Sequence, residues 1–507
     1  MTRVAVALFV KNEFSDITGW LAWHFAIGVD TVFVYDDHST DGTWEILQAA
    51  SKFLDIKLYR TNPELQSNFY WRQRDSYLDA AKKALDQNYD WIAFLDGDEY
   101  IYIDLFDDVH PFLAQFPDAE GVALNWCIYG SGGKVVRPKT STPEAFVWRA
   151  NETLNDAVLV KSFIRPQYLR EPYQNPHRFS VDDEKYVDAN GMKVNWEGAT
   201  KKINWSGARV LHYICRSMEH YVERIRRRLN ADMSNSTVYW DHFNRNDVED
   251  FSAHKFLPKV NAIISKINYQ SVSYAIKKLR ERSVDLELPI HNERRRKFKQ
   301  NSRTNVYKIR SYHGYPIYIN HETCNVVQIK SEMVAGLNYS RLYCVIREDF
   351  PGIVELRGGL SVSIAEHMRL NIESDDRNFP ILIYKFSTLE NISVFEKKIL
   401  LKNPINDLFL AALPMENEAV EKRIESNRHQ ASEWEWFFIE PISFSDENSI
   451  IVQEKSRKLS AADIVHWVGR DEELPNVEEF LSALAELPKE EIIKLSSFVP
   501  GLLWSVI

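Results

Sequence analysis

The segment WIAFLDGDEYIYI, residues 91–103, has the pattern of a buried strand that ends in three carboxylates, Asp96, Asp98 and Glu99, and then continues as a second apolar run. Carboxylates at the edge of an apolar core are costly unless a positive group lies beside them. Asp96 and Asp98 are two residues apart in an extended segment, so their side chains leave the same side of the chain. Gly97 lets a ligand approach the backbone closely.

These features predict a cation site. Hard divalent cations such as Mg²⁺ or Mn²⁺ are held by one or two carboxylates, and substrate phosphates and water complete the shell. We therefore expect a metal diphosphate beside Asp96 and Asp98. The alternative is an ordinary acidic turn after a strand, which an isolated Asp-Gly-Asp would favour. The position of the motif in the predicted sheet favours the cation site.

The residues that lead up to this segment alternate short apolar runs with amphipathic ones, a pattern typical of strands and helices in turn. This order predicts a mainly parallel sheet with helices on both faces, in which ligands bind beyond the carboxyl ends of the strands. The polar residues Asn12, Glu13, Asp36, Asp37 and Asp96 fall at those ends. Strands are predicted over 3–12, 31–37, 55–61 and 90–96, and helices over 15–28, 41–53 and 69–88.

Composition limits the class of protein. The chain has 507 residues, 45% of them hydrophobic, which suits two or three globular domains. The net charge of -10 disfavours a nucleic-acid partner. Four scattered cysteines argue against a disulfide scaffold. The first residues show no signal peptide, and no apolar run is long enough to span a membrane, so we expect a cytoplasmic protein.

The pattern changes in the C-terminal half. After a basic segment, 291–303, short apolar runs separated by turns predict an all-β domain over 304–444. A faint threefold division resembles a β-trefoil, with a β-sandwich as the alternative. The basic segment is interpreted as a solvated linker, or as a contact for lipid or phosphate at a membrane surface. We thus expect four parts, with a helical tail last: 1–290, 291–303, 304–444 and 445–507.

Several phrases carry a resemblance to a known family. VKNE at 10–13, WLAWHFAIGVDTVFVYDDHSTDGT at 20–43, RQRDSYLDAAKKA at 72–84 and WIAFLDGDEYIYI resemble family 2-like glycosyltransferases, in the branch near family 92. WCIYGSGGK, VKSFIRP, PHRF and VLHYICRSMEHYVERI, between residues 126 and 225, fit the same branch. The resemblance implies the A-type nucleotide-diphosphosugar transferase fold. It also implies transfer of a sugar from a nucleotide-sugar donor, most often a UDP-sugar, with inversion and with Mn²⁺ or Mg²⁺.

The resemblance also implies roles for individual residues. Asp96 and Asp98 match the acidic metal and donor motif, and His212 matches a further metal ligand. The alternative for His212 is a core histidine at a strand end. The donor would meet Asn12, Glu13, Asp36, Arg72, Gln73 and Asp96, whereas the diphosphate or the acceptor would meet Lys161, Arg165 and His177.

The catalytic base is the least defined part of the predicted site. An inverting transferase needs a carboxylate or imidazole within hydrogen-bond reach of the acceptor hydroxyl. The glutamate-aspartate pair usual in family 2, and the aromatic basic phrase after it, are absent. VDDEKY, at 181–186, supplies Asp182, Asp183 and Glu184, of which Asp183 is the candidate, against the alternative of a solvated loop. Asp156 is a weaker candidate.

Three functions remain open at this point. The first is a metal-dependent hexosyltransferase that acts on a saccharide or glycolipid acceptor in the synthesis of surface polysaccharide or glycan. The second is a carbohydrate or nucleotide-sugar binding protein without catalysis. The third, a nucleotidyltransferase, is disfavoured because no Gly-rich basic loop follows the first strand. The sequence specifies neither the sugar, nor the acceptor, nor the oligomeric state.

Overall fold

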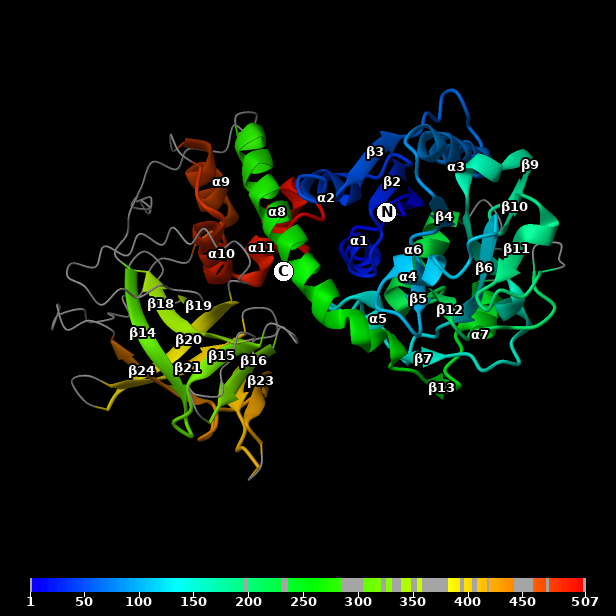
Figure 1. Ribbon diagram of the computed structural model, residues 1–507. Coiled ribbons are helices and arrows are strands. Elements are labelled where there is room, and N and C mark those ends of the chain that lie inside the picture. Colours follow the sequence, from blue (N-terminus) through cyan, green and yellow to red (C-terminus); the bar gives the residue numbers. More distant parts are fainter. Residues whose placement is uncertain are drawn as a thin grey trace. The chain divides into compact units, whose positions relative to one another are not determined.

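A computed structural model represents the protein, and its residues fall into two compact units, Met1–Ser271 and Val272–Ile507, each described by itself (Figure 1). The division lies inside the helix α8 (Leu257–Ser283). The predicted domain bounds stay a prediction, and the linker 291–303 lies outside the described residues. The structure describes residues 2–194, 199–228, 236–283, 304–320, 325–330, 339–347, 353–357, 382–392, 396–403, 408–416, 419–441, 459–470 and 474–504.

The first unit is built on one mixed sheet in the order β3-β2-β1-β4-β8-β6-β12-β5, with β11 paired to β6. β1 to β4 are mutually parallel where they pair, whereas β8 runs antiparallel to β4 and β6. The predicted α/β domain is therefore confirmed. Its strands are β1 (Val4–Val10), β2 (Thr31–Asp36), β3 (Ile56–Arg60), β4 (Trp91–Leu95), β5 (Glu99–Ile103), β6 (Gly121–Ile128), β8 (Val160–Ile164), β11 (Tyr186–Asp188) and β12 (Ala208–His212).

Helices and short strand pairs complete this unit. Two pairs stand apart from the main sheet, β9 (Arg170–Asn175) with β10 (Arg178–Ser180), and β7 (Trp148–Arg149) with β13 (Val248–Glu249). The helices are α1 (Ile17–Ala26), α2 (Thr43–Ala50), α3 (Phe69–Asp86), α4 (Val109–Leu113), α5 (Thr142–Ala145), α6 (Met218–Arg228) and α7 (Ser236–Phe243), followed by α8.

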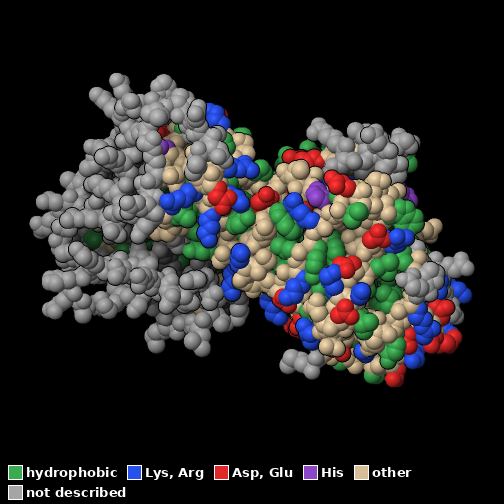
Figure 2. Space-filling view, turned by 90° about the horizontal axis from the view of Figure 1, so that it is seen from above, with side chains coloured by type: hydrophobic (Ala, Val, Ile, Leu, Met, Phe, Trp, Pro, Cys, Tyr) green, Lys and Arg blue, Asp and Glu red, His purple; other side chains and the backbone are tan. Residues whose placement is uncertain are grey.

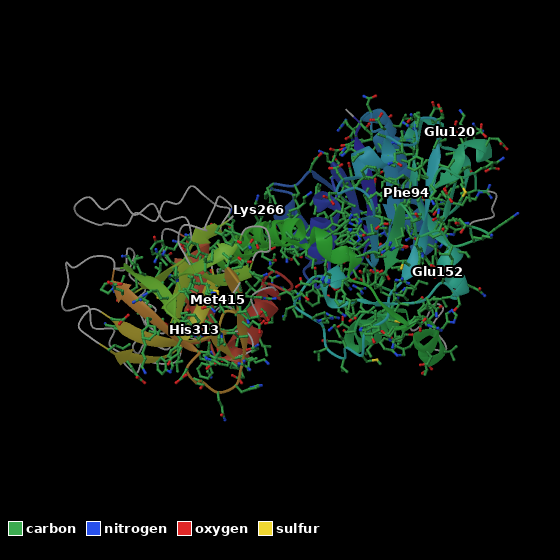
Figure 3. The ribbon with its side chains drawn as sticks, turned by 60° about the horizontal axis from the view of Figure 1, so that its bottom comes forward. Phe94, Glu120, Glu152, Lys266, His313 and Met415 are labelled. Carbon is green, nitrogen blue, oxygen red and sulfur yellow. The ribbon has the colours of Figure 1, made fainter. Side chains whose placement is uncertain are left out.

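β1 and β4, in the middle of the sheet, are apolar along their whole length, as expected for strands that are covered on both faces. Every residue of β1 and β4 is buried. On one face Phe9 and Phe94, the latter labelled in Figure 3, pack in a cluster with Tyr77 and the alanines of α3. Strands that are buried on both faces need no polar alternation. The sheet is thus a rigid support, and the polar residues gather where its strands end.

The second unit contains an antiparallel all-β domain, as predicted. Six strands pair in a closed ring, β14-β18-β19-β20-β21-β24 and back to β14, and β22, β23, β16, β15 and β17 continue from β21. The trefoil, the sandwich and the bounds 304–444 stay predictions. The strands are β14 (Thr304–Ser311), β15 (Ile317–Asn320), β16 (Asn325–Ile329), β17 (Tyr339–Arg341), β18 (Tyr343–Arg347), β19 (Ile353–Arg357), β20 (Leu382–Asn391), β21 (Lys397–Lys402), β22 (Phe409–Ala412), β23 (Glu421–Arg428) and β24 (Trp436–Pro441).

Three short helices follow, and they confirm the predicted helical tail. They are α9 (Ala461–Arg470), α10 (Val477–Glu486) and α11 (Lys489–Phe498). Asn476 and Glu479 form a capping box at the start of α10, and Pro488 occupies the N-cap position of α11. On α10 the buried Ser482 hydroxyl donates to Glu355 of β19 at 2.9 Å, which ties the tail to the all-β domain.

Two surface properties bear on the expected partners. Within the described ranges, no helix is both long and apolar enough to cross a membrane. Figure 2 shows basic and acidic side chains interspersed over the described residues of the face in view.

Candidate functional site

One edge of the sheet in the first unit collects most of the predicted site residues. β1, β2 and β4 are parallel, so the residues that follow them, Asn12, Asp37 and Asp96, emerge at the same edge. β8 is antiparallel and starts there with Val160 and Lys161. β12 ends there with His212, which pairs with the first residue of β5, Glu99. We call this side of the sheet the carboxyl edge.

A buried lysine lies at the centre of the carboxyl edge. Lys161 is 1% exposed, and its Nζ lies 2.9 Å from Asp96 Oδ2 and 3.1 Å from Glu99 Oε2. The other Asp96 oxygen accepts hydrogen bonds from Gln73 Nε2 at 2.8 Å and from the Tyr77 hydroxyl at 3.2 Å. Lys161 is therefore the positive group that the acidic end of β4 requires.

Charge and burial oppose each other in this cluster. Burial lowers the pKa of Lys161, but the carboxylates of Asp96 and Glu99 outweigh it and raise the pKa above its ordinary value. Burial raises the pKa of Glu99 to about 7, although Lys161 acts in the opposite direction. For Asp96, burial is outweighed by Lys161, and the pKa falls below its ordinary value. At neutral pH Lys161 is charged and Asp96 is ionised.

Asp98 lies in a second group with His212 and Arg224. Its Oδ2 accepts a hydrogen bond from Arg224 Nη1 at 3.0 Å, and its Oδ1 lies 3.6 Å from His212 Nε2. Burial raises the pKa of Asp98, but His212 and Arg224 overcome this effect and hold the pKa well below its usual value. Asp98 is thus a carboxylate across the neutral range.

Asp98 and His212 can serve as two ligands of one cation. Their 3.6 Å separation is too long for a hydrogen bond. It suits two ligands of Mg²⁺ or Mn²⁺, since bonds of about 2.1 Å place neighbouring ligands roughly 3 to 4 Å apart. His212 Nδ1 is buried and has no hydrogen-bond partner among the described residues. Within those residues, however, no group of three or more His, Cys, Asp or Glu side chains is arranged for a metal ion.

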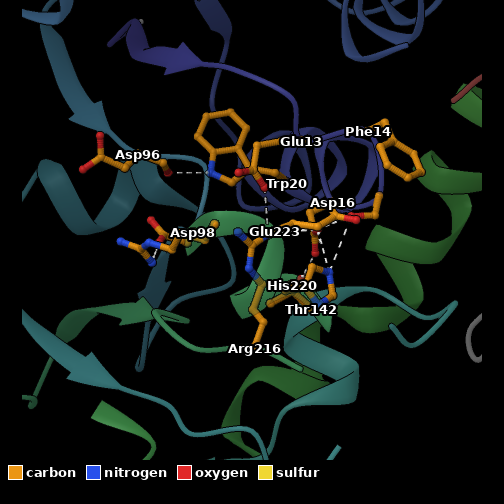
Figure 4. Close-up of polar contacts among 12 residues, drawn as sticks. Glu13, Phe14, Asp16, Trp20, Asp96, Asp98, Thr142, Arg216, His220 and Glu223 are labelled. Atoms are coloured by element: carbon orange, nitrogen blue, oxygen red, sulfur yellow. Dashed lines mark hydrogen bonds and ion pairs between the residues drawn. The ribbon is translucent and has the colours of Figure 1, made fainter. Parts of the chain in front are cut away.

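A buried arginine connects the loops after β1 and β12 (Figure 4). Arg216 Nη1 lies 2.9 Å from Glu13 Oε2 and 2.9 Å from Asp16 Oδ2. Asp16 also accepts from Thr142 Oγ1 at 2.7 Å and lies 3.1 Å from His220 Nε2. Arg216 has a φ of +52°, a left-handed conformation unusual for this residue type. The network fixes the position of Glu13 at the carboxyl edge.

The remaining predicted donor residues lie at the ends of β1 and β2. Asn12 has a φ of +53°, and its side-chain oxygen accepts the backbone N–H of Thr40 at 2.8 Å. Asp36 is fully buried, accepts the backbone N–H of Ser39, and lies 3.2 Å from Arg60 Nε. These bonds hold the loops after the two strands together.

Arg72 is paired with Asp37, a residue to which the sequence analysis assigned no role of its own. Its Nε and Nη2 donate to the two oxygens of Asp37 at 2.7 and 2.8 Å, a bidentate pair. Thr61 Oγ1 donates to the same carboxylate at 2.6 Å, and Lys11 Nζ donates at 3.3 Å. Burial raises the pKa of Asp37, but its bonds to Arg72 and Thr61 lower the net value to about 2.

Two predicted residues lie at the opposite edge of the sheet. Arg165 follows β8, and its Nε donates to the carbonyl of Ala119 at 2.9 Å while its guanidinium covers the Trp91 ring. Asp183 precedes β11, whose Tyr186 pairs with Gly121 at the start of β6, beside Glu120, which Figure 3 labels. The exposed Asp183 side chain accepts a hydrogen bond from Arg178 at 2.9 Å.

The sequence analysis named Asp37 and Glu99 only as polar residues at strand ends, without a role of their own. It missed Arg216 and Arg224, although the quoted segment 210–225 contains both. For the two arginines the available signal was their position after His212, four and twelve residues along the chain. Asp37 and Glu99 adjoin predicted residues, but only pairing with Arg72 and Lys161 distinguishes them. The remaining predicted residue, His177, lies in the turn between β9 and β10, close to Val160.

Comparison with known proteins supports the resemblance. Residues 26–165 match the model of the glycosyl transferase family 2, which confirms the predicted family 2-like domain and its A-type fold. A glycosyltransferase family 92 protein of Oryza sativa subsp. japonica is 23% identical over 201 residues, which are 38% of this chain and 32% of the relative. The chain thus spans about a third of the length of that curated relative.

Solved structures give a weaker likeness. The alignment with S. aureus TarS 1-349 covers 57% of this chain and 76% of the TarS chain, at 16% identity and a TM-score of 0.25. Its complex with UDP has 15% identity and a TM-score of 0.26 at the same coverage. Full TarS covers 87% of this chain and 96% of its own, at 12% identity and a TM-score of 0.24.

Proposed function

We propose that this protein, which contains a family 2-like domain, is a glycosyltransferase that moves a sugar from a nucleoside-diphosphate sugar to a saccharide or glycolipid acceptor. The observation that carries the proposal is the acidic end of β4 within the matched segment. There, Asp96 and Asp98 lie beside Lys161, Arg224 and His212 at the carboxyl edge. This arrangement offers both carboxylates for a cation and cations for a diphosphate.

The donor occupies the carboxyl edge in this proposal. Asn12, Glu13 and Asp36 stand where β1 and β2 end. In this proposal they would meet the nucleoside. Gln73 reaches the same region because its side chain donates to Asp96. Arg72 acts by holding Asp37 in place, since its guanidinium is already bidentate to that carboxylate. UDP-sugars are the first donors to test.

Asp98 and His212 would hold a Mn²⁺ or Mg²⁺ ion, and Asp96 would add negative charge to the same site. A bound cation would neutralise the charge that develops on the diphosphate leaving group. The chain itself contributes further positive charge through Lys161 and Arg224, both of which bond a carboxylate of the motif. These groups stabilise a leaving diphosphate by preorganised electrostatics.

Transfer with inversion requires a base on the face of the sugar opposite to the leaving group. The proposal includes a role in the synthesis of surface polysaccharide or glycan. It also includes a cytoplasmic location and a contact of the basic segment 291–303 with a membrane surface. The all-β domain would then bind a polymeric acceptor and raise its effective concentration.

A donor screen on the full chain tests the proposal. UDP-glucose, UDP-galactose and their N-acetylated forms are added with Mn²⁺, with Mg²⁺ or with excess chelator, and both thermal stability and UDP release are measured. A donor at 100 times its dissociation constant adds about 2.7 kcal/mol of stability. Stabilisation with UDP release supports the transferase, whereas stabilisation without release indicates a binding protein. No response to any donor would overturn the proposal, and full turnover in chelator would overturn its metal.

A further inference from the structure

His177 is held by its backbone in the turn that joins β9 to β10. Asn175 Oδ1 accepts the backbone N–H of His177 at 2.8 Å and that of Arg178 at 3.0 Å. This pattern is an Asx turn, which fixes the chain locally. The backbone that carries the imidazole is therefore fixed by hydrogen bonds.

The ring is also fixed, and the hydrogen bond that fixes it decides its tautomer. His177 Nδ1 lies 3.1 Å from the carbonyl oxygen of Val160, the first residue of β8. A carbonyl only accepts hydrogen bonds, so Nδ1 carries the proton and Nε2 carries the lone pair. The Trp126 ring packs edge-on against the imidazole, with ring centres 5.0 Å apart. Nε2 itself has no hydrogen-bond partner within the described part of the chain.

The surroundings keep the imidazole neutral. Burial, together with the charge of Lys161, lowers the pKa of His177 to about 4. The charged or titratable groups that influence the ring are Lys161, Asp96 and His212. At neutral pH the side chain is therefore an uncharged proton acceptor beside the centre of the carboxyl edge.

We propose that His177 is the general base of the transfer reaction, an inference that rests on the proposed function. Nε2 takes the proton of the acceptor hydroxyl while the hydroxyl oxygen bonds to the anomeric carbon. The bond from that carbon to the diphosphate oxygen breaks, and its electron pair leaves with the nucleoside diphosphate. The imidazolium then returns its proton to solvent.

The carboxylates considered from sequence are less suited to this role. Asp183 lies at the opposite edge of the sheet, beside the start of β6. Asp156 Oδ2 is bonded by His242 Nε2 at 2.7 Å. His177 alone among these candidates combines a fixed ring, an available acceptor atom and a position next to β8.

The test uses the full chain and the UDP-sugar panel with Mn²⁺, and it measures UDP release and stabilisation by UDP. In His177→Asn the amide nitrogen can replace Nδ1 as the donor to Val160, but no basic nitrogen remains. We expect UDP release to fall about 100-fold or more, as for removal of a general base. Stabilisation by UDP should stay unchanged. Added imidazole should restore UDP release in His177→Gly by at least about tenfold, as expected when a soluble base replaces the lost one.

The matched control is His110→Asn, at a histidine bonded to Asp30 and Asp108 outside the carboxyl edge, which should keep full activity. An active wild type with an equally active His177→Asn variant would overturn the role of His177 and leave the proposed function intact. Loss of activity together with loss of stabilisation by UDP, and no rescue by imidazole, would show a structural role and would also overturn it. A wild type that turns over no donor would overturn the proposed function and this inference with it.

Discussion

Lys161 and Arg165 lie four residues apart along β8 and its end, yet they meet opposite edges of the same sheet. At the carboxyl edge Lys161 is buried and pairs with two carboxylates, Asp96 and Glu99. At the other edge Arg165 donates to the backbone carbonyl of Ala119. The difference teaches that a basic residue near a family motif is informative only when its edge of the sheet is known.

The largest effect is expected at the carboxyl edge from Asp98→Asn. The change keeps the size of the side chain but removes the charge that Arg224 and a cation both require. Activity should fall by about 10³-fold, near 4 kcal/mol in transition-state free energy. UDP release with saturating donor and Mn²⁺ measures it. Asp183→Asn, at the opposite edge, is the control and should leave the rate unchanged. A rate above a tenth of wild type in Asp98→Asn would contradict the proposed role of Asp98.

The second largest effect is expected from removal of the Lys161 charge at the carboxyl edge. Lys161→Met leaves Asp96 and Glu99 without their buried positive partner, and breaking such a pair costs about 3 kcal/mol. The free energy of unfolding in urea should fall by that amount, and UDP release should fall about 100-fold. A stability equal to wild type would mean that Glu99 simply takes up a proton and that the pair is not structural.

The stability that Asp37 contributes should depend on pH, since this residue at the carboxyl edge has a pKa of about 2. An unfolded aspartate titrates near pH 3.9. Because the folded pKa is lower, the stabilisation is present above pH 4 and is lost as the pH falls towards 2. Asp37→Asn should therefore cost about 2 kcal/mol at pH 7, and less at pH 3, in urea denaturation.

Asp75→Asn is the control for this acid effect, because Asp75 is half-exposed and paired with its neighbour Arg74. It should change the stability little at either pH. An Asp37→Asn cost that does not depend on pH would show that packing, and not charge, holds that position.

The smallest effect is expected from Arg165→Met. The loss of its hydrogen bond to Ala119 and of its contact with the Trp91 ring should lower the free energy of unfolding by about 1 kcal/mol. UDP release should stay within about twofold of wild type, because the change lies away from the groups that stabilise the leaving diphosphate. A loss of activity as large as that of Lys161→Met would place Arg165 in the catalytic machinery and remove the contrast between the two edges.

The sequence by itself determined the alternation of strands and helices, the all-β half, the helical tail and the acidic end of β4. These follow from local patterns of apolar residues, breaks and charge, which act over a few residues. Asn12, Asp96 and Asp98 could be placed at one edge because consecutive parallel strands end on the same side.

Only the tertiary structure decided which charges meet. Lys161 and Asp96 are 65 residues apart, and they come together because β8 inserts antiparallel beside β4. The same pairing places Arg165 at the opposite edge, although Arg165 lies only four residues after Lys161 in the sequence. Strand register depends on long-range packing, which no local pattern encodes. The pairing of Arg216 with Glu13, across 203 residues, arises in the same way.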